Sequence, residues 1–379
     1  MTSTKHLRRA GLSLAVLAAL QANAGVDFAR GTLGLEINSK AEHDSNVFGN
    51  NSEKADELLT VIPEITYVRN VGLISVDMST GVKIQRFSDF TDLNTDDFFA
   101  GAKLDYDAAE KGNASFEIGY ERFSAANEAV LARTESDEYK AKGSFDYFYS
   151  EKLGLRVLAG YTDSQQLLVG FNDVTTYQLG TGALYRYSPK LVANLSYNFR
   201  NTATDNVAVG LANPDSNDHR ISFGVEGEIT PKLTGRAATG IVYREFDTGG
   251  DDTGFFADVG LTWDVLEKTS ITLDIGNDYN TSAGAQSSEN FSAKLGISQE
   301  LLEKLIGRAS ISYGNDNYDA SGPVAARQDD TYTLSAGLTY TFTDSVSTAF
   351  DLSYKDSSSD LATADYERTL VTISLDAKF

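Results

Sequence analysis

Residues 332–342, YTLSAGLTYTF, alternate between apolar or aromatic side chains and small or polar ones. Successive side chains of a β-strand point to opposite sides of the sheet, so this segment predicts a strand with one apolar and one mostly polar face. The same alternation recurs in residues 114–121, 153–161, 191–199 and 255–263. No window of helix length after residue 24 shows a helical period, which predicts an all-β protein.

An internal repeat predicts how these strands are connected. Short polar turns recur roughly 36–42 residues apart, a spacing that accommodates two strands and one longer loop. The turns lie near residues 69–72, 109–112, 150–152, 188–190, 230–232, 266–268, 302–304 and 343–345. Between them are longer loops rich in Asn, Asp, Gly and Ser, for example 201–217, 246–253 and 315–330. With one further strand at each end (about 32–42 and 366–379), the repeat predicts about 18 antiparallel strands, with 16 as the nearest alternative.

Large aromatic residues are sorted by strand direction. Strands that leave a short turn carry one near their far end, and returning strands carry one just before the next turn. The first group comprises Tyr120, Tyr161, Tyr197, Tyr243, Tyr279 and Tyr313, and the second comprises Tyr106, Tyr147, Tyr185, Trp263 and Tyr340. Together they form two rings, as expected at the two interfaces of a membrane. A soluble sandwich or solenoid has no reason to sort its aromatic residues in this way, so we predict a transmembrane antiparallel up-and-down β-barrel.

The two ends of the chain predict export. Lys5, Arg8 and Arg9 precede an apolar run of residues 10–20, and Ala-Asn-Ala follows at 22–24. This order is typical of a secretory signal, so we predict a signal peptide over 1–24 and an outer-membrane barrel over 25–379, in a Gram-negative-type bacterium. The last strand alternates up to a terminal Phe379, which resembles the signal read by the barrel-assembly machinery.

Charge and composition disfavour several functions. The chain has 32 basic and 54 acidic residues, so nucleic acid is not an expected partner. It has no cysteine, and beyond the predicted signal only His43 and His219 remain as histidines. Residues 92–96 match the start of a calcium loop, but Asp97 stands where the glycine is needed and Lys103 where the bidentate glutamate is needed. We therefore expect no enzyme activity, no catalytic residue, no metal site and no cofactor.

The polar face of the strands carries charges of both signs. By strand parity the candidate lumen-lining residues are Glu117, Glu121, Lys140, Lys142, Arg156, Arg186, Arg200, Arg236, Arg244, Asp258, Asp274, Asp278 and Arg308. A barrel of this size is wide enough for an aqueous channel, so these residues could line a path for solutes. The alternative is that opposite charges on adjacent strands cross-link the lumen and have a structural role only.

The first strands resemble a known family. Residues 33–36 (LGLE), 43–48 (HDSNVF) and 59–64 (LTVIPE) are similar to the start of the putative beta-barrel porin 2 family. The resemblance implies a barrel without catalytic residues. Some members of that family accompany genes for exopolysaccharide synthesis and export.

Three functions remain open from the sequence. The leading hypothesis is a porin-like passive channel for small hydrophilic solutes. The alternatives are a conduit or accessory for exopolysaccharide export, and a non-conducting structural barrel. Expected partners are outer-membrane lipid and lipopolysaccharide, with the barrel-assembly machinery during biogenesis, and the oligomeric state stays open.

Overall fold

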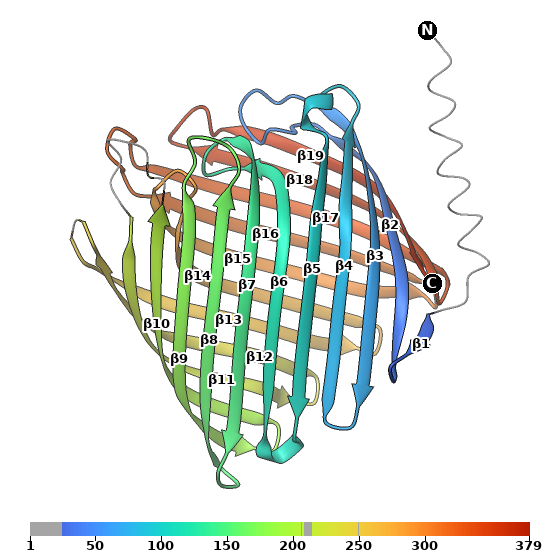
Figure 1. Ribbon diagram of the computed structural model, residues 1–379, viewed down its shortest axis with the longest axis vertical. Helices are drawn as coiled ribbons and strands as arrows, with labels where there is room; N and C mark the ends of the chain where they lie inside the picture. The colour runs from blue at the N-terminus through green and yellow to red at the C-terminus, as the bar shows by residue number, and fades with distance from the viewer. Residues whose placement is uncertain (1–24, 206, 208–213, 249) are drawn as a thin grey trace.

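The computed structural model describes residues 25–205, 207, 214–248 and 250–379. The predicted signal peptide lies outside these residues. Eighteen long strands follow one another along the chain, and each pairs with the next (Figure 1). They are β2 (Gly31–Asp44), β3 (Asp56–Val71), β4 (Ile74–Phe87), β5 (Thr95–Asp107), β6 (Gly112–Asn127), β7 (Ala132–Phe148), β8 (Leu153–Gln166), β9 (Asp173–Ser188), β10 (Leu191–Asp205), β11 (Ser216–Thr230), β12 (Leu233–Phe246), β13 (Asp252–Leu266), β14 (Thr269–Thr281), β15 (Ser287–Leu302), β16 (Leu305–Tyr318), β17 (Arg327–Thr343), β18 (Val346–Ser359) and β19 (Tyr366–Lys378).

The barrel closes where the last strand meets the first long one. β19 pairs antiparallel with β2 from Leu370 opposite Asp44 to Lys378 opposite Glu36. Phe379 extends this seam, because its backbone exchanges two hydrogen bonds with Leu35 at 2.8 and 3.0 Å. The prediction of a closed antiparallel barrel of 18 strands is confirmed. A short strand, β1 (Val26–Phe28), was not predicted. It pairs with residues 31–33 of β2, which precede the residues of β2 that pair with β19.

The two ends of the barrel differ as the repeat predicts. At one end, here called the turn end, the strands are joined by all eight predicted turns. One of these turns contains a short 3-10 helix (Ala109–Lys111), and another is a bend at residues 149–152. The opposite end, here called the loop end, carries the longer connections, including residues 45–55 and 319–326. The connections after β10 and after β16 are shorter than the expected loops 201–217 and 315–330, because β10, β16 and β17 extend into these ranges and β11 begins at Ser216.

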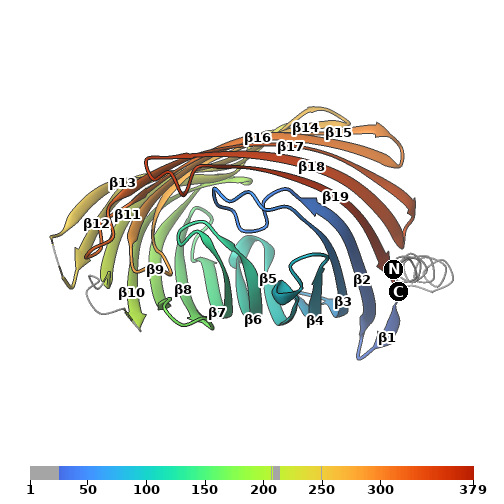
Figure 2. The ribbon, with the colours of Figure 1, turned by 90° about the horizontal axis from the view of Figure 1, so that it is seen from above.

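The outer surface is apolar and the inner surface polar. Ile118, Leu195 and Ile241 are among many large apolar side chains exposed on the outside, as a face in contact with lipid requires. The described part of the chain contains no helix long and apolar enough to cross a membrane. Seen from above, the barrel is flattened, so that the wall of β3–β9 faces the wall of β14–β18 (Figure 2).

One predicted interface residue is misplaced. Tyr106, Tyr147, Tyr185, Trp263 and Tyr340 are exposed near the turn end, and Tyr197 and Tyr243 are exposed near the loop end. The prediction for Tyr279 is wrong, because its side chain is only 5% exposed.

The cause is a break in the barrel wall. The pairing of β13 with β14 ends at Asp258 opposite Gly276 and does not continue from there toward the loop end. The side-chain amide of Asn277 accepts from the backbone N–H of Ala257 at 2.7 Å and replaces the lost strand contact there. The tip of β14 therefore leans away from β13, and Tyr279 packs beneath the guanidinium of Arg244, 4.8 Å from the ring centre.

Candidate functional site in the lumen

The strand register places the predicted lining residues on the inner face of the barrel. Glu117 lies opposite Lys142, Arg236 opposite Glu226, and Asp274 opposite Lys294. Their sequence neighbours on the other parity, such as Ile118, are exposed on the outer face. The same parity holds for Glu121, Lys140, Arg156, Arg186, Arg200, Arg244, Asp258, Asp278 and Arg308. The inner wall is thus charged along its whole height, with both signs present.

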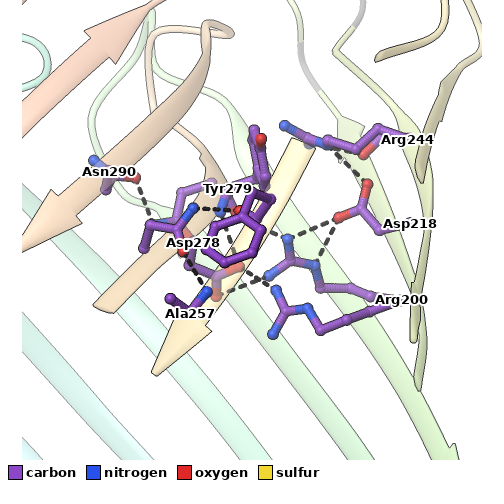
Figure 3. A network of polar contacts seen from close by, with 12 residues as sticks. Arg200, Asp218, Arg244, Ala257, Asp278, Tyr279 and Asn290 are labelled. Carbon is purple, nitrogen blue, oxygen red and sulfur yellow. Dashed lines mark hydrogen bonds and ion pairs between the residues drawn. The ribbon is translucent and has the colours of Figure 1, made fainter. Parts of the chain in front are cut away.

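A network of arginines and aspartates ties the inward tip of β14 to β10, β11 and β12 (Figure 3). Asp218 accepts from Nε of Arg200 at 2.8 Å and from Nε of Arg244 at 2.8 Å. Arg200 also donates to the backbone oxygen of Tyr279 at 2.8 Å and contacts the carboxylate of Asp278 at 3.3 Å. The arrangement holds β14 across the lumen from β10, as paired charges with several hydrogen bonds can do in a partly buried place.

Two members of this network were missed by the sequence reasoning. Arg220 donates to Asp278 at 2.6 Å, and Asp218 bridges the two other arginines. Both belong to the part of β11 that adjoins the segment interpreted as a loop. They could have been found by continuing the alternation of β11 from residue 222 to residues 220 and 218, which share its inner face.

A second cluster lies closer to the turn end. Arg156 donates to Asp146 at 2.8 and 2.6 Å and to Glu226 at 2.5 Å. Asp146 is on the neighbouring strand, whereas Glu226 is on β11, three strands away from β8. The side chain of Arg156 therefore extends along the inner wall and links β7, β8 and β11.

Residues 128–131, the connection between β6 and β7, form a contact centre at the loop end that we call the mouth hub. The carboxylate of Glu128 lies 2.5 Å from Nζ of Lys355 on β18. Arg327 of β17 donates to the backbone oxygens of Glu128 and Ala129 at 3.2 and 3.3 Å. Since β17 and β18 belong to the wall opposite β6 and β7, these bonds cross the lumen (Figure 2).

Two further connections meet the mouth hub. The side-chain amide of Asn50, from the connection between β2 and β3, donates to the backbone oxygen of Leu131 at 3.1 Å. Gly284, from the connection between β14 and β15, lies so close that a Cβ there would be 3.3 Å from Cγ1 of Val130. Short connections from three parts of the barrel thus narrow the loop end, a role that no sequence pattern in them predicts.

The buried pair of Arg244 and Asp218 predicts a large stability effect. Their side chains are 3% and 4% exposed, so Asp218→Ala leaves a buried guanidinium without its carboxylate. We expect this change to cost about 3–5 kcal/mol of unfolding free energy. The measurement is urea unfolding of the refolded barrel, followed by the fluorescence of its single tryptophan, Trp263.

The matched control is Asp258→Ala. Asp258 pairs with Arg236 at 2.6 Å on the same inner face, but these side chains are 34% and 58% exposed. An exposed pair contributes roughly 0–1 kcal/mol, so the control should unfold close to the parent protein. Equal losses in both variants would contradict the role assigned to the buried pair.

With this geometry established, comparison with known proteins gives the family. The family profile described as "Putative beta-barrel porin 2" matches residues 32–379. The chain belongs to this family. The family is not known to be catalytic, and in the described part of the chain no group of three or more His, Cys, Asp or Glu residues could hold a metal ion.

Solved structures support the same fold. Two crystal structures of OpdK from Pseudomonas aeruginosa, one with vanillate and one describing the protein as OccK1, are each 10% identical to the chain. Each alignment covers 92% of this chain and 99% of the other, with a TM-score of 0.52. Among curated proteins, none matches the chain significantly. The likeness shows a shared barrel fold, and a barrel of this family agrees with a place in the bacterial outer membrane.

Proposed function

We propose that this protein is a passive channel for small hydrophilic solutes in the outer membrane of a Gram-negative-type bacterium. The observation that carries the proposal is a closed barrel of 18 strands whose inner wall is charged from one end to the other. Barrels of this size leave an aqueous lumen when loops do not fill it. Short turns face the periplasm and the loop end faces outward in barrels of this kind, which supports an outer opening at the mouth hub.

The contacts across the lumen favour small solutes over polymers. The mouth hub and the inward tip of β14 narrow the loop end, and below them Arg156 binds Glu226 across three strands of the inner wall. The fold is shared with OpdK, one of whose structures contains vanillate, a small molecule. The proposal is therefore a narrow channel with a selective mouth, and the cross-lumen contacts give no support to the expectation of an exopolysaccharide conduit.

Conductance in a planar lipid bilayer tests the proposal. The refolded protein should give stable ohmic steps, smaller than those of a barrel of equal size with an open mouth. Salt gradients would then give the ion selectivity from the reversal potential. Heat-modifiable protein that inserts but never conducts would contradict the proposal.

Protein that inserts but never conducts would favour a non-conducting structural barrel. One observation supports this second candidate: bonds from three connections and two opposite walls already meet at the mouth hub. If those bonds never open, the barrel has a polar interior but no continuous path. The bilayer measurement separates the two functions directly.

A further inference from the structure

A polar cavity of about 420 Å³ lies directly beneath the mouth hub. One wall is formed by β8, β9 and β10, and the other by the inward tip of β14 and the residues that follow it. The β14 wall is fixed on two sides of the cavity. Arg200 binds the backbone oxygen of Tyr279, and Asn172 donates twice to the backbone oxygen of Ala283, at 2.9 and 3.0 Å. The cavity therefore has walls that are held in place by hydrogen bonds, and its volume lies in the range of small-molecule sites, about 300–1,000 Å³.

Hydroxyl groups face each other across this cavity. On the first wall Thr162, Thr176 and Thr202 are direct neighbours in the register of β8, β9 and β10 and form one row on the inner face. On the second wall Thr281 and Ser282 line the same space. A hydroxyl can both donate and accept, so this lining suits a ligand that does the same at several positions.

Several polar atoms at this cavity lack a partner. Oε1 of Gln166 and Oγ1 of Thr281 are buried and have no hydrogen bond in the described part of the chain, and both residues line the cavity. Oδ1 of Asn172, next to Ala283, is likewise unpaired. A buried oxygen without a donor is costly, so the wall of this cavity carries unsatisfied acceptors just behind its open surface.

The charges around the cavity are already paired. Arg200 and Arg244 reach its edge, but both are bound to Asp218, and Arg200 also contacts Asp278. The carboxylate of Glu138 is engaged by Lys140. A charged solute would have to compete with these pairs, whereas a neutral one would not.

We propose that this cavity is a binding subsite for a small neutral polyhydroxylated solute, such as a mono- or disaccharide or a polyol. The inference rests on the proposed channel function and names the class of solute that the channel takes. The solute hydroxyls exchange hydrogen bonds with the threonine row, Thr162, Thr176 and Thr202. Binding beneath the mouth hub would hold the solute at the narrow part of its path.

The test measures equilibrium binding to the refolded protein in detergent, without any requirement for conduction. The probes are glucose and sucrose, with benzoate and putrescine as anionic and cationic comparisons, in ligand-observed NMR and calorimetric titration. We expect the two sugars to bind and the two ions not to. The variant Thr176→Val with Thr202→Val should raise the sugar dissociation constant about tenfold or more, because the solute loses the hydrogen bonds of both hydroxyls.

The control is Thr272→Val with Thr333→Val. Both threonines have inner-face parity on β14 and β17 but do not line this cavity. The control should bind sugar as the parent does, and both double variants should keep the heat-modifiable folded form.

The outcomes separate the two proposals. Binding of benzoate without sugar would overturn the neutral class of solute, and equal loss in both double variants would overturn the assignment to the threonine row. No binding by a protein that conducts would overturn the subsite and leave the channel function standing. Sugar binding by a protein that never conducts would support the subsite and contradict the channel function.

Discussion

Replacing Glu128, Val130 and Leu131 together with glycine should raise the single-channel conductance several-fold. The change removes the ion pair with Lys355 at 2.5 Å and the side chain that contacts Gly284. Without them, only backbone acceptors still hold the connection between β6 and β7: the oxygens of Glu128 and Ala129 bound by Arg327, and the oxygen of Leu131 bound by Asn50. The connection can then move away from the centre of the loop end, and the opening there becomes wider. Conductance in a planar bilayer measures the change.

Leu361→Gly is the control for this prediction. Leu361 lies in the connection between β18 and β19, and its side chain is exposed. This control adds a glycine at the same end of the barrel without removing a contact across the lumen. Its conductance should equal that of the parent protein. A triple glycine variant with parental conductance would show that the mouth hub does not limit the current.

A disulfide tests the closed mouth independently of conductance. The chain has no cysteine, so Val130→Cys with Gly284→Cys introduces the only two thiols. A Cβ at position 284 would lie 3.3 Å from Cγ1 of Val130, which is close enough for a disulfide to form with little movement. We expect both thiols to be lost on mild oxidation of the folded protein. Thiols that stay free under these conditions would contradict the contact.

The strands could be predicted from the sequence because their signal is local. The alternation in 332–342 depends only on neighbours two residues apart, and it corresponds to β17. The ends of the strands were predicted less well, since β10 and β11 continue into a segment rich in polar residues that was interpreted as loop. Above the apolar band the outer face of a strand no longer contacts lipid, so its alternation fades while its hydrogen bonds continue.

The mouth hub and the cavity could not be predicted in the same way. Glu128 meets Lys355, which is 227 residues away, and no local pattern in residues 128–131 indicates that they turn inward. Tyr279 has the right parity for the outer face, yet the bond between Asn277 and Ala257 replaces a strand pair and lets β14 lean inward. These features depend on which connections meet when the flattened barrel closes, and the sequence alone does not give that shape.

Phe379→Ala should strongly reduce the amount of folded protein in the outer membrane of cells, while it leaves refolding in detergent nearly unchanged. The seam between β19 and β2 runs over nine register pairs, from Leu370 to Lys378. The substitution keeps the two backbone hydrogen bonds with Leu35 and removes only the ring, which packs against Val346 and Ala377. Closure of the barrel therefore depends little on the ring, and we propose that the ring acts mainly in recognition by the assembly machinery, as its resemblance to the assembly signal predicts.

Deletion of Phe379 is the comparison that separates the two effects. It removes the ring and also the last two hydrogen bonds of the seam, so refolding in detergent should be somewhat slower than for Phe379→Ala. In cells the two variants should be equally depleted, because both lack the ring. Heat-modifiable mobility measures folding in detergent, and the same assay on isolated outer membranes measures assembly. If Phe379→Ala failed in detergent as badly as in cells, the ring would act in closure of the barrel, because no assembly machinery is present in detergent.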